Sequence, residues 1–529
     1  MNVPEALAPR LLLILLLTTG LPTGAQNVTT SQYDNTRNGA NRLETILTPR
    51  NVNVRQFGKL FTLKVDGDVY AQPLFLTGVD IPGKGRHDVL FVATEHDSIY
   101  AFDAYGHPAS PLWRVNFLKK GVTTVSEDDV ECPFIVPEVG ITSTPVIDAD
   151  TGTLYVLVRT KEQTGSPSAH YTQRLHALEV TTGLEKLGGP VDIKATINGK
   201  GDGSLSGKVN FDPLRENPRA SLLLANGSVY LSWASSCDVG PYHGWVMAYD
   251  AHTLKQKAVF NTSPDGDDSG IWASDTGPVA DASGNLFLAT GNGRFDAAKG
   301  GRDYGDSLLK LDGQSLKVAD YFAPFNVDKL DADDNDLGSG GPVLLPSQFG
   351  PHPHLVAIAG KGGTVYLVDR DHMGHYQPKN DNQAVQTITS GGGVFGSMAY
   401  WNHNLYVLSN SSNDALRQFF LHEGKLTLKS ASGSLFPAIA ATPTISANGA
   451  RSGVLWVLRP NDDRSAVLYA FDAVDSSHLL YDSEQNPSRD RAGLALHFNL
   501  PTIMNGHVYV GAKHEVDVYG LLTRKIAGK

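Results

Sequence analysis

A short phrase recurs six times along the chain, and it constrains the fold more than any other feature. In each copy, an alternating apolar segment ends in an acidic residue, followed in most copies by a small or turn-forming residue. The copies read IYAFDA at 99–104, LHALEV at 175–180, VMAYDA at 246–251, LLKLDG at 308–313, VYLVDR at 365–370 and LYAFDA at 468–473. A phrase with the period of a β-strand, repeated at intervals of several tens of residues, indicates one supersecondary unit used many times.

The units also begin alike, with a short strand that in most copies carries proline. Proline is tolerated at the first residue of a strand because no hydrogen-bond donor is lost inside the sheet. The clear openings read QPLF at 72–75, TPVI at 144–147, GPVA at 277–280, GPVL at 341–344, TPTI at 442–445 and LPTI at 500–503, with weaker ones at 220–223 and 396–399. Together they predict about eight units of about four strands each.

Four-stranded units that continue through most of a chain can bury their sheets by packing radially. A row of β-sandwich domains is the alternative, but the continuous repeat spacing leaves no room for linkers. The 54 glycines and the lack of an amphipathic helical pattern predict an all-β protein. We therefore expect one domain over residues 26–529, an eight-bladed β-propeller of four-stranded antiparallel blades.

The first residues have the pattern of a secretory signal peptide. Arg10 precedes the apolar run LLLILLL at 11–17, and small residues lead to a cleavage site after Ala25. This apolar run is too short to cross a bilayer, and no later run is long enough either. The mature protein over 26–529 is expected to be extracytoplasmic, in the periplasm or secreted. A net charge of −11 without a basic patch argues against a nucleic-acid partner.

Two cysteines, Cys132 and Cys237, remain after export. An oxidising compartment permits a disulfide between them, and two buried free thiols are the alternative. A bridge would connect the loop before the second blade with the loop closing the third.

The acidic run DADDND at 331–336 begins like a calcium-binding loop. It lacks the glycine that such a loop needs at its sixth place. The sequence therefore predicts a solvated acidic loop.

The recurring phrase resembles the repeat of the pyrroloquinoline quinone (PQQ) propellers, the family of quinoprotein alcohol dehydrogenases and their non-catalytic relatives. Three segments sharpen the resemblance: ATGNG at 289–293, YGDSL at 304–308 and KGGTVYLVDR at 361–370. The resemblance implies that Asn292 binds calcium beside the cofactor. It also implies that Asp306 is the general base and a calcium neighbour, and that Lys361 faces the quinone carbonyl and takes part in catalysis.

Weaker matches implied by the same resemblance are Asp238 as a calcium ligand and Trp272 as the floor under the cofactor. The family's adjacent cysteine pair is missing here, and the loop between Asn292 and Asp306 is short. A Cys132–Cys237 bridge would then cap the same pocket from a different direction.

These residue types suit the chemistry. A divalent cation and a lysine together polarise a quinone carbonyl, calcium prefers carboxylate and amide oxygens, and a carboxylate can remove a hydroxyl proton. Structural roles are the alternative for each residue alone: Asp306 as a turn cap, Asn292 as a turn residue and Lys361 as a solvated strand-edge lysine.

Two functions follow. The first is an exported PQQ- and calcium-dependent dehydrogenase of alcohols, aldehydes or sugars, with a small-molecule substrate and an external electron acceptor. The second is a non-catalytic propeller that binds envelope proteins as a scaffold. The enzyme requires that Asp238, Asn292, Asp306 and Lys361 share one rim, whereas a scaffold does not.

Overall fold

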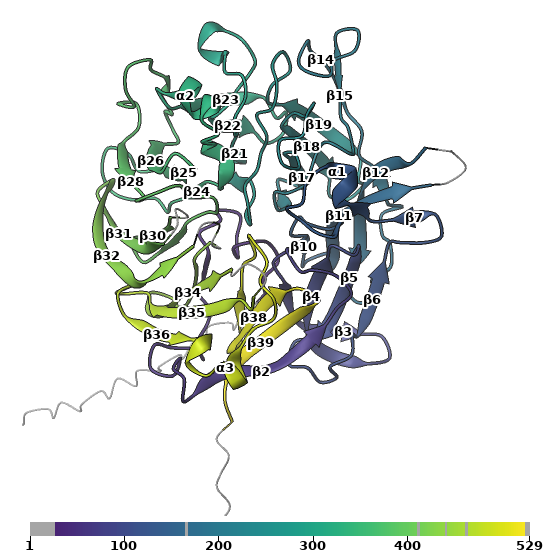
Figure 1. Ribbon diagram of the computed structural model, residues 1–529, viewed down its shortest axis with the longest axis vertical. Helices are drawn as coiled ribbons and strands as arrows, with labels where there is room; N and C mark the ends of the chain where they lie inside the picture. Colours follow the sequence, from purple (N-terminus) through teal and green to yellow (C-terminus); the bar gives the residue numbers. More distant parts are fainter. Residues whose placement is uncertain are drawn as a thin grey trace, which may run out of the picture.

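The computed structural model is a ring of eight β-sheets, and the chain passes from blade to blade around it (Figure 1). The structure describes residues 27–163, 168–409, 413–437, 439, 442–460 and 464–523. The proposed cleavage site after Ala25 lies outside them. Each blade has at least four antiparallel strands, so the predicted eight-bladed propeller is confirmed. No helix of the described residues is long and apolar enough to span a membrane.

Each blade begins at the axis and proceeds outward along the chain, except that the last blade takes its outermost strand from the N-terminal region. From the axis outward, the blades are: blade 1, β3 (Leu74–Ile81), β4 (Gly85–Thr94), β5 (Ser98–Asp103) and β6 (Trp113–Asn116); blade 2, β10 (Val146–Asp148), β11 (Thr153–Glu162), β12 (His170–Glu179) and β13 (Val191–Asp192); blade 3, β16 (Leu223–Ala225), β17 (Ser228–Trp233), β18 (Trp245–Asp250) and β19 (Gln256–Asn261); blade 4, β20 (Val279–Ala280), β21 (Asn285–Ala289), β22 (Leu308–Asp312) and β23 (Val318–Ala323); blade 5, β24 (Val343–Leu344), β25 (Leu355–Ala359), β26 (Thr364–Asp369) and β28 (Gln386–Thr389); blade 6, β29 (Ala399–Trp401), β30 (Asn404–Leu408), β31 (Asp414–His422) and β32 (Lys425–Phe436); blade 7, β33 (Thr444–Asn448), β34 (Arg451–Arg459), β35 (Val467–Asp472) and β36 (Leu479–Asp482); blade 8, β37 (Thr502–Met504), β38 (His507–Ala512), β39 (Glu515–Leu521) and β2 (Phe57–Lys64).

Short elements decorate the blades. The strands are β1 (Ala40–Asn41), parallel to β33; β27 (His375–Tyr376), parallel to β23; β7 (Val122–Thr123), paired with β11; and the two-stranded pairs β8 (Val125–Ser126) with β9 (Glu138–Val139) and β14 (Thr196–Asn198) with β15 (Lys208–Asn210). The helices are α1 (Glu127–Val130), α2 (Val327–Ala332) and α3 (Pro487–Asp490), with single 3₁₀ turns η1 (Ala297–Lys299), η2 (Leu337–Ser339) and η3 (Ser483–Gln485).

The recurring phrase is the third strand of a blade, and both of its final residues accept hydrogen bonds that stabilise the fold. The acidic residue caps the turn that follows: Asp250 Oδ1 accepts hydrogen bonds from the His252 N–H and the Thr253 hydroxyl. The next residue accepts a hydrogen bond from the preceding blade. The Tyr155 hydroxyl of blade 2 donates to the Ala251 carbonyl at 2.6 Å, and Tyr509 of blade 8 donates to Ala104 of blade 1 in the same way.

A buried N-terminal segment, residues 27–41, lies against the inner strands around the axis. Backbone N–H groups of six blades donate to carbonyls of this segment. The pairs are Phe75 with Val28, Ile147 with Thr29, Ala280 with Asn35, Leu344 with Thr36, Tyr400 with Asn38 and Ile445 with Gly39.

Side chains of the same segment reach the other two blades. The Arg37 guanidinium, fully buried, donates to the Leu222 carbonyl at the start of blade 3. The Tyr33 hydroxyl accepts from the Ile503 N–H of blade 8. The axial segment therefore contacts every blade, and with β2 it closes the ring from the N-terminal end of the chain.

Candidate functional site

The main pocket has a volume of about 170 Å³ and lies at one face of the ring. Its walls come from two kinds of loop: those that enter an inner strand and those between the second and third strands of a blade. In an antiparallel blade these loops emerge at the same face. A cavity of about 20 Å³ adjoins it and shares Phe134, Ile135, Arg219 and Phe498 with it. The axial segment lies beside this cavity, since the Ser31 hydroxyl donates to the Asp275 carbonyl.

The two cysteines form a disulfide that lines the pocket. Cys132 and Cys237 have their Cα atoms 5.5 Å apart and are bonded, so of the two alternatives the structure has the bridge. Cys132 lies in the loop before blade 2, as expected, but Cys237 lies between β17 and β18, inside blade 3 rather than in the loop closing it. Both half-cystines contribute to the pocket wall. The bridge thus gives the pocket an apolar surface and ties two blades together across it.

Trp272, predicted as an aromatic floor, also lines the pocket. It lies in the loop before β20, where Tyr242 packs edge-on against it at 6.4 Å. Its indole Nε1 is buried and has no hydrogen-bond partner among the described residues. The pocket therefore offers an aromatic face with an unused N–H donor at its edge.

Lys361 lies on the turn between β25 and β26 and points its ammonium at two carboxylates. Its Nζ is 2.5 Å from Asp336 Oδ2 and 2.7 Å from Asp334 Oδ1, and it lies 5.7 Å from the centre of the Phe395 ring. Burial alone would lower the pKa of Lys361, but the attraction of Asp336 and the hydrogen bonds to both carboxylates raise it. Lys361 is therefore a protonated donor on the pocket wall.

The acidic run at 331–336 is exposed over residues 331–334, as the sequence predicts, but its last residue is buried. Asp336 is only 3% exposed and lines the pocket. Burial raises its pKa, while the charge of Lys361 opposes the rise. Asp331, at the end of α2, accepts a hydrogen bond from the Gly293 N–H. The sequence pattern gives no sign that Asp336 is buried. Asp336 lies in a loop entering an inner strand, the kind of loop that builds the pocket.

Asn292 meets the same carboxylates as Lys361. Its N–H donates to Asp336 Oδ1 at 2.8 Å, and its Nδ2 donates to Asp334 Oδ1 at 2.9 Å. Its Oδ1 is buried with no partner in the described part of the chain. The expected placement of Asn292 and Lys361 on one rim is thus what the structure has.

Asp306 lies behind this rim rather than in the pocket wall. It is fully buried, and its Oδ1 accepts from the Leu337 N–H at 2.8 Å. Burial, reinforced by the charges of Asp336 and Asp331, raises its pKa well above the ordinary range. Because the pocket wall carries Asp336 instead, the structure does not bring Asp306 to a position facing a substrate.

Asp238 lines the pocket on the disulfide side and is exposed. Its Oδ1 accepts from the Tyr242 hydroxyl at 2.8 Å, and among the described residues it shares no hydrogen-bond partner with Asn292 or Lys361. Over the described residues, no three His, Cys, Asp or Glu side chains gather closely enough to hold a metal ion. The oxygen donors are suitable in type but do not form a ready cage.

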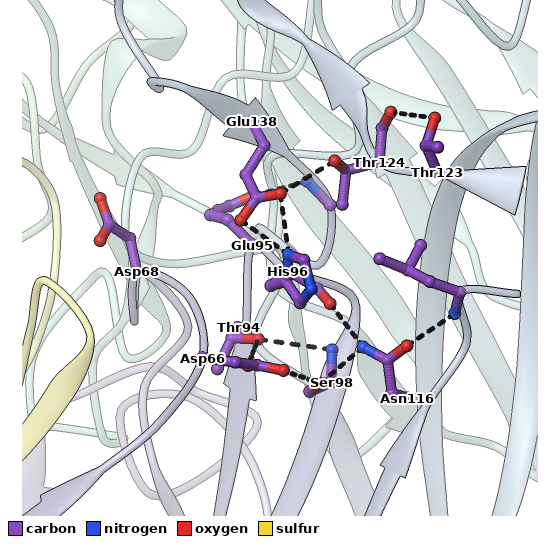
Figure 2. Close-up of polar contacts among 12 residues, drawn as sticks. Asp66, Asp68, Thr94, Glu95, His96, Ser98, Asn116, Thr123, Thr124 and Glu138 are labelled. Carbon is purple, nitrogen blue, oxygen red and sulfur yellow. Dashed lines mark hydrogen bonds and ion pairs between the residues drawn. The ribbon is translucent and has the colours of Figure 1, made fainter.

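A second polar cluster supports the pocket from blade 1 (Figure 2). Glu95 is 1% exposed, and its Oε2 accepts from the Gly140 N–H at 2.7 Å and the Thr142 hydroxyl at 3.0 Å. Burial raises its pKa to about 8. Nearby, His96 Nδ1 is 2.9 Å from Glu138 Oε2. This cluster holds the 138–142 segment, which contributes Val139 and Thr142 to the two cavities.

Eight radial blades with a loop-built pocket at one face define the class of the eight-bladed β-propellers. A quinohemoprotein alcohol dehydrogenase from Pseudomonas putida HK5 is similar with a TM-score of 0.64 and 14% identity, over 95% of this chain and 82% of that one. A europium-containing methanol dehydrogenase is similar with a TM-score of 0.61 and 13% identity, over 94% and 98%. No family model and no curated protein matches the sequence. At these identities the likeness establishes the fold.

Proposed function

We propose that the main pocket binds a planar quinone cofactor of the PQQ type, and that the protein is an extracytoplasmic dehydrogenase of alcohols, aldehydes or sugars. One observation carries the proposal: a disulfide, an indole and a Lys–Asp pair line the same pocket. Cys132–Cys237 and Trp272 offer flat apolar contact, and Lys361 offers a charged donor.

The residues present fit a planar, polar-edged cofactor. The buried Trp272 Nε1 has no acceptor within the described residues and is available to one on a ligand. An aromatic ring can stack on Trp272, while carbonyl groups at its edge meet N–H donors. Such a distribution of apolar walls with few polar groups is typical of cofactor sites.

Asp336 and Lys361 are the residues that can act on a substrate. A bound quinone supplies a two-electron acceptor. The Asp336 carboxylate can accept the proton of a substrate hydroxyl, and its raised pKa brings it closer to the range in which a general base works well. Lys361 holds Asp336 in place and could donate a hydrogen bond to a carbonyl oxygen of a bound quinone. The base in this proposal is therefore Asp336, in place of Asp306.

Calcium does not fit as readily as the quinone. Asn292 Oδ1 is a free oxygen donor, but Asp238 is bonded to Tyr242 and Asp306 lies behind the wall. Lys361 already provides positive charge beside Asp336. We therefore propose no step through calcium, and we expect quinone binding to persist in a chelator.

The experiment that tests the proposal is a titration of the purified exported protein with PQQ, with calcium or with EDTA, followed by tryptophan fluorescence. We expect saturable binding in both conditions, and dye-linked oxidation of an alcohol or sugar by the loaded protein. Electrons would pass to a separate carrier. Absence of any PQQ binding would overturn the proposal and favour a scaffold that binds envelope proteins.

A further inference from the structure

Arg219 is a cation of the pocket that has no ion-pair partner among the residues the structure describes. It lies in the loop before β16 and lines both the main pocket and the smaller cavity. Its guanidinium carbon is 4.4 Å from the centre of the Phe498 ring, 5.7 Å from Phe134 and 5.9 Å from Trp272. Aromatic faces therefore surround it where a carboxylate usually would.

No carboxylate lies within ion-pair distance of Arg219 in the described part of the chain, and its Nε is buried without a hydrogen-bond acceptor there. Burial lowers the pKa of Arg219 to about 10, and Tyr70 and three acidic residues (Asp275, Glu95 and Asp238) oppose this shift from a distance. The Asp275 carboxylate is already used, since it accepts from the N–H and hydroxyl of Thr442. Glu95 accepts from Gly140 and Thr142, and Asp238 from Tyr242.

Lys361, also a cation of the pocket wall, differs from Arg219 because it has carboxylate partners. Lys361 has two aspartates within 2.7 Å of its Nζ. A partly buried cation without such partners is disfavoured unless a ligand supplies them. A planar guanidinium presents paired N–H donors that match the two oxygens of a carboxylate.

In addition to the Arg219 Nε, two buried polar atoms of the pocket wall have no partner within the described residues: Trp272 Nε1 and Asn217 Oδ1. Asn217 and Arg219 are neighbours in one loop, where the Arg219 N–H donates to the Asn217 carbonyl. Among the described residues, the Arg219 guanidinium thus has no charged partner, whereas the Lys361 ammonium is bonded to two aspartates.

We propose that Arg219 anchors a carboxylate of the ligand in the main pocket, and so selects a planar aromatic carboxylate over an uncharged analogue. The inference rests on the proposed function for the cofactor's identity, but the carboxylate requirement comes from Arg219 itself. The carboxylate has two sources, the cofactor or an acidic substrate, and the experiment separates them.

The test compares wild type, Arg219→Met and Arg219→Lys by titration with three probes: PQQ, its trimethyl ester, and benzene-1,3,5-tricarboxylate, which is planar and anionic but not a quinone. For wild type we expect PQQ to bind about 10- to 100-fold more tightly than the ester, because charge-assisted hydrogen bonds are lost in the ester. Arg219→Met should bind PQQ and the ester equally weakly, and Arg219→Lys should recover part of the preference.

Arg215→Met is the matched control. Arg215 lies in the same loop, pairs with Glu131 at 2.8 Å and does not line the main pocket. It should leave the preference unchanged. Thermal unfolding without ligand checks that each variant folds.

The outcomes distinguish this inference from the proposed function. If PQQ fails to bind but the tricarboxylate binds wild type and not Arg219→Met, the cofactor is wrong and the anion site stands, which points to an acidic substrate. If Arg219→Met keeps the wild-type preference for PQQ over its ester, Arg219 does not anchor the carboxylate. If neither anionic probe binds wild type, the inference is overturned.

Discussion

At the scale of single residues, the pocket depends on how burial and neighbouring charges set protonation. Lys361 and Asp336 are close enough for each to stabilise the charge of the other, although burial disfavours both charges. Glu95 has no cation bonded to it in the described residues, and burial raises its pKa to about 8. The Lys361–Asp336 pair is therefore expected to affect how activity depends on pH, and Glu95 how stability depends on pH.

Lys361→Met should move the pH dependence of activity. Lys361 lowers the pKa of Asp336 against the effect of burial, so its removal should raise that pKa further. Because the base must be ionised, the acid limb of the kcat/KM profile should shift to higher pH, with weaker PQQ binding. The measurement is a pH series of dye-linked turnover. Lys329→Met, whose exposed lysine pairs with Asp333 on α2, is the control and should leave the profile in place. An unshifted pH profile in Lys361→Met would show that Lys361 does not set the pKa of the catalytic base.

Glu95→Gln should change how stability depends on pH. Glu95 stays protonated in the folded protein up to about pH 8, whereas in the unfolded chain it ionises near pH 4.5. Between these values the folded state holds one more proton, so stability falls as pH rises, by at most about 1.4 kcal/mol per pH unit from this group.

Glutamine removes that loss, so the variant should gain stability relative to wild type from pH 5 to pH 8. Denaturant unfolding at several pH values measures this difference. Glu423→Gln, at an exposed carboxylate, is the control and should follow wild type. Parallel profiles for Glu95→Gln and wild type would contradict the assigned protonation.

At the scale of elements, the loops at one face position the pocket while the strands beneath them only support it. The disulfide connects two such loops across a sequence separation of 105 residues. A cross-link of that span restricts the unfolded chain strongly.

The double variant Cys132→Ser and Cys237→Ser should lose about 4–5 kcal/mol of stability on the chain-entropy account. It should also bind PQQ more weakly, because both half-cystines form the pocket wall. Thermal unfolding and the PQQ titration measure the two effects. Reductant should reproduce both in wild type and have no effect on the double variant. Equal affinity of wild type and the double variant for PQQ would show that the disulfide does not contribute to binding.

The sequence predicts the strands that belong to the repeated unit, but not the structure of the loops between the units. Proline openings mark residues directly before inner strands, as Pro73 before β3 and Pro278 before β20. Trp272 and Lys361 were found through motifs near strand ends, and both line the pocket. Asp336 and Arg219 were missed because they lie in loops between blades, which differ in length and carry no repeated phrase. Their roles come from contacts with other blades that a linear pattern does not display.

At the scale of the whole molecule, the axial segment 27–41 joins the blades. Arg37 Nη1 donates to the Thr30 hydroxyl and Ser31 carbonyl, and Nη2 to the Leu222 carbonyl. Each acceptor is buried, so removal of the donor leaves it unsatisfied at a cost of about 1–3 kcal/mol.

Arg37→Met should therefore lower the unfolding temperature and loosen the ring while the blade sheets persist. Thermal melts, with limited proteolysis near residue 40, measure this. Arg42→Met, an exposed arginine of the same region, is the control and should behave as wild type. A melt of Arg37→Met identical to wild type would show that the segment does not hold the blades together.

The axial segment also sets an order in time. It precedes all eight blades in the sequence and is synthesised before them, yet its partners include Ile445 of blade 7 and Ile503 of blade 8, which are synthesised after the other blades. β2 likewise waits for β39. The ring cannot close until nearly the whole chain has been delivered, so the early blades must persist with open edges, and closure is a single late event. Truncation near the C-terminus would therefore leave the axial segment without its partners in blade 8.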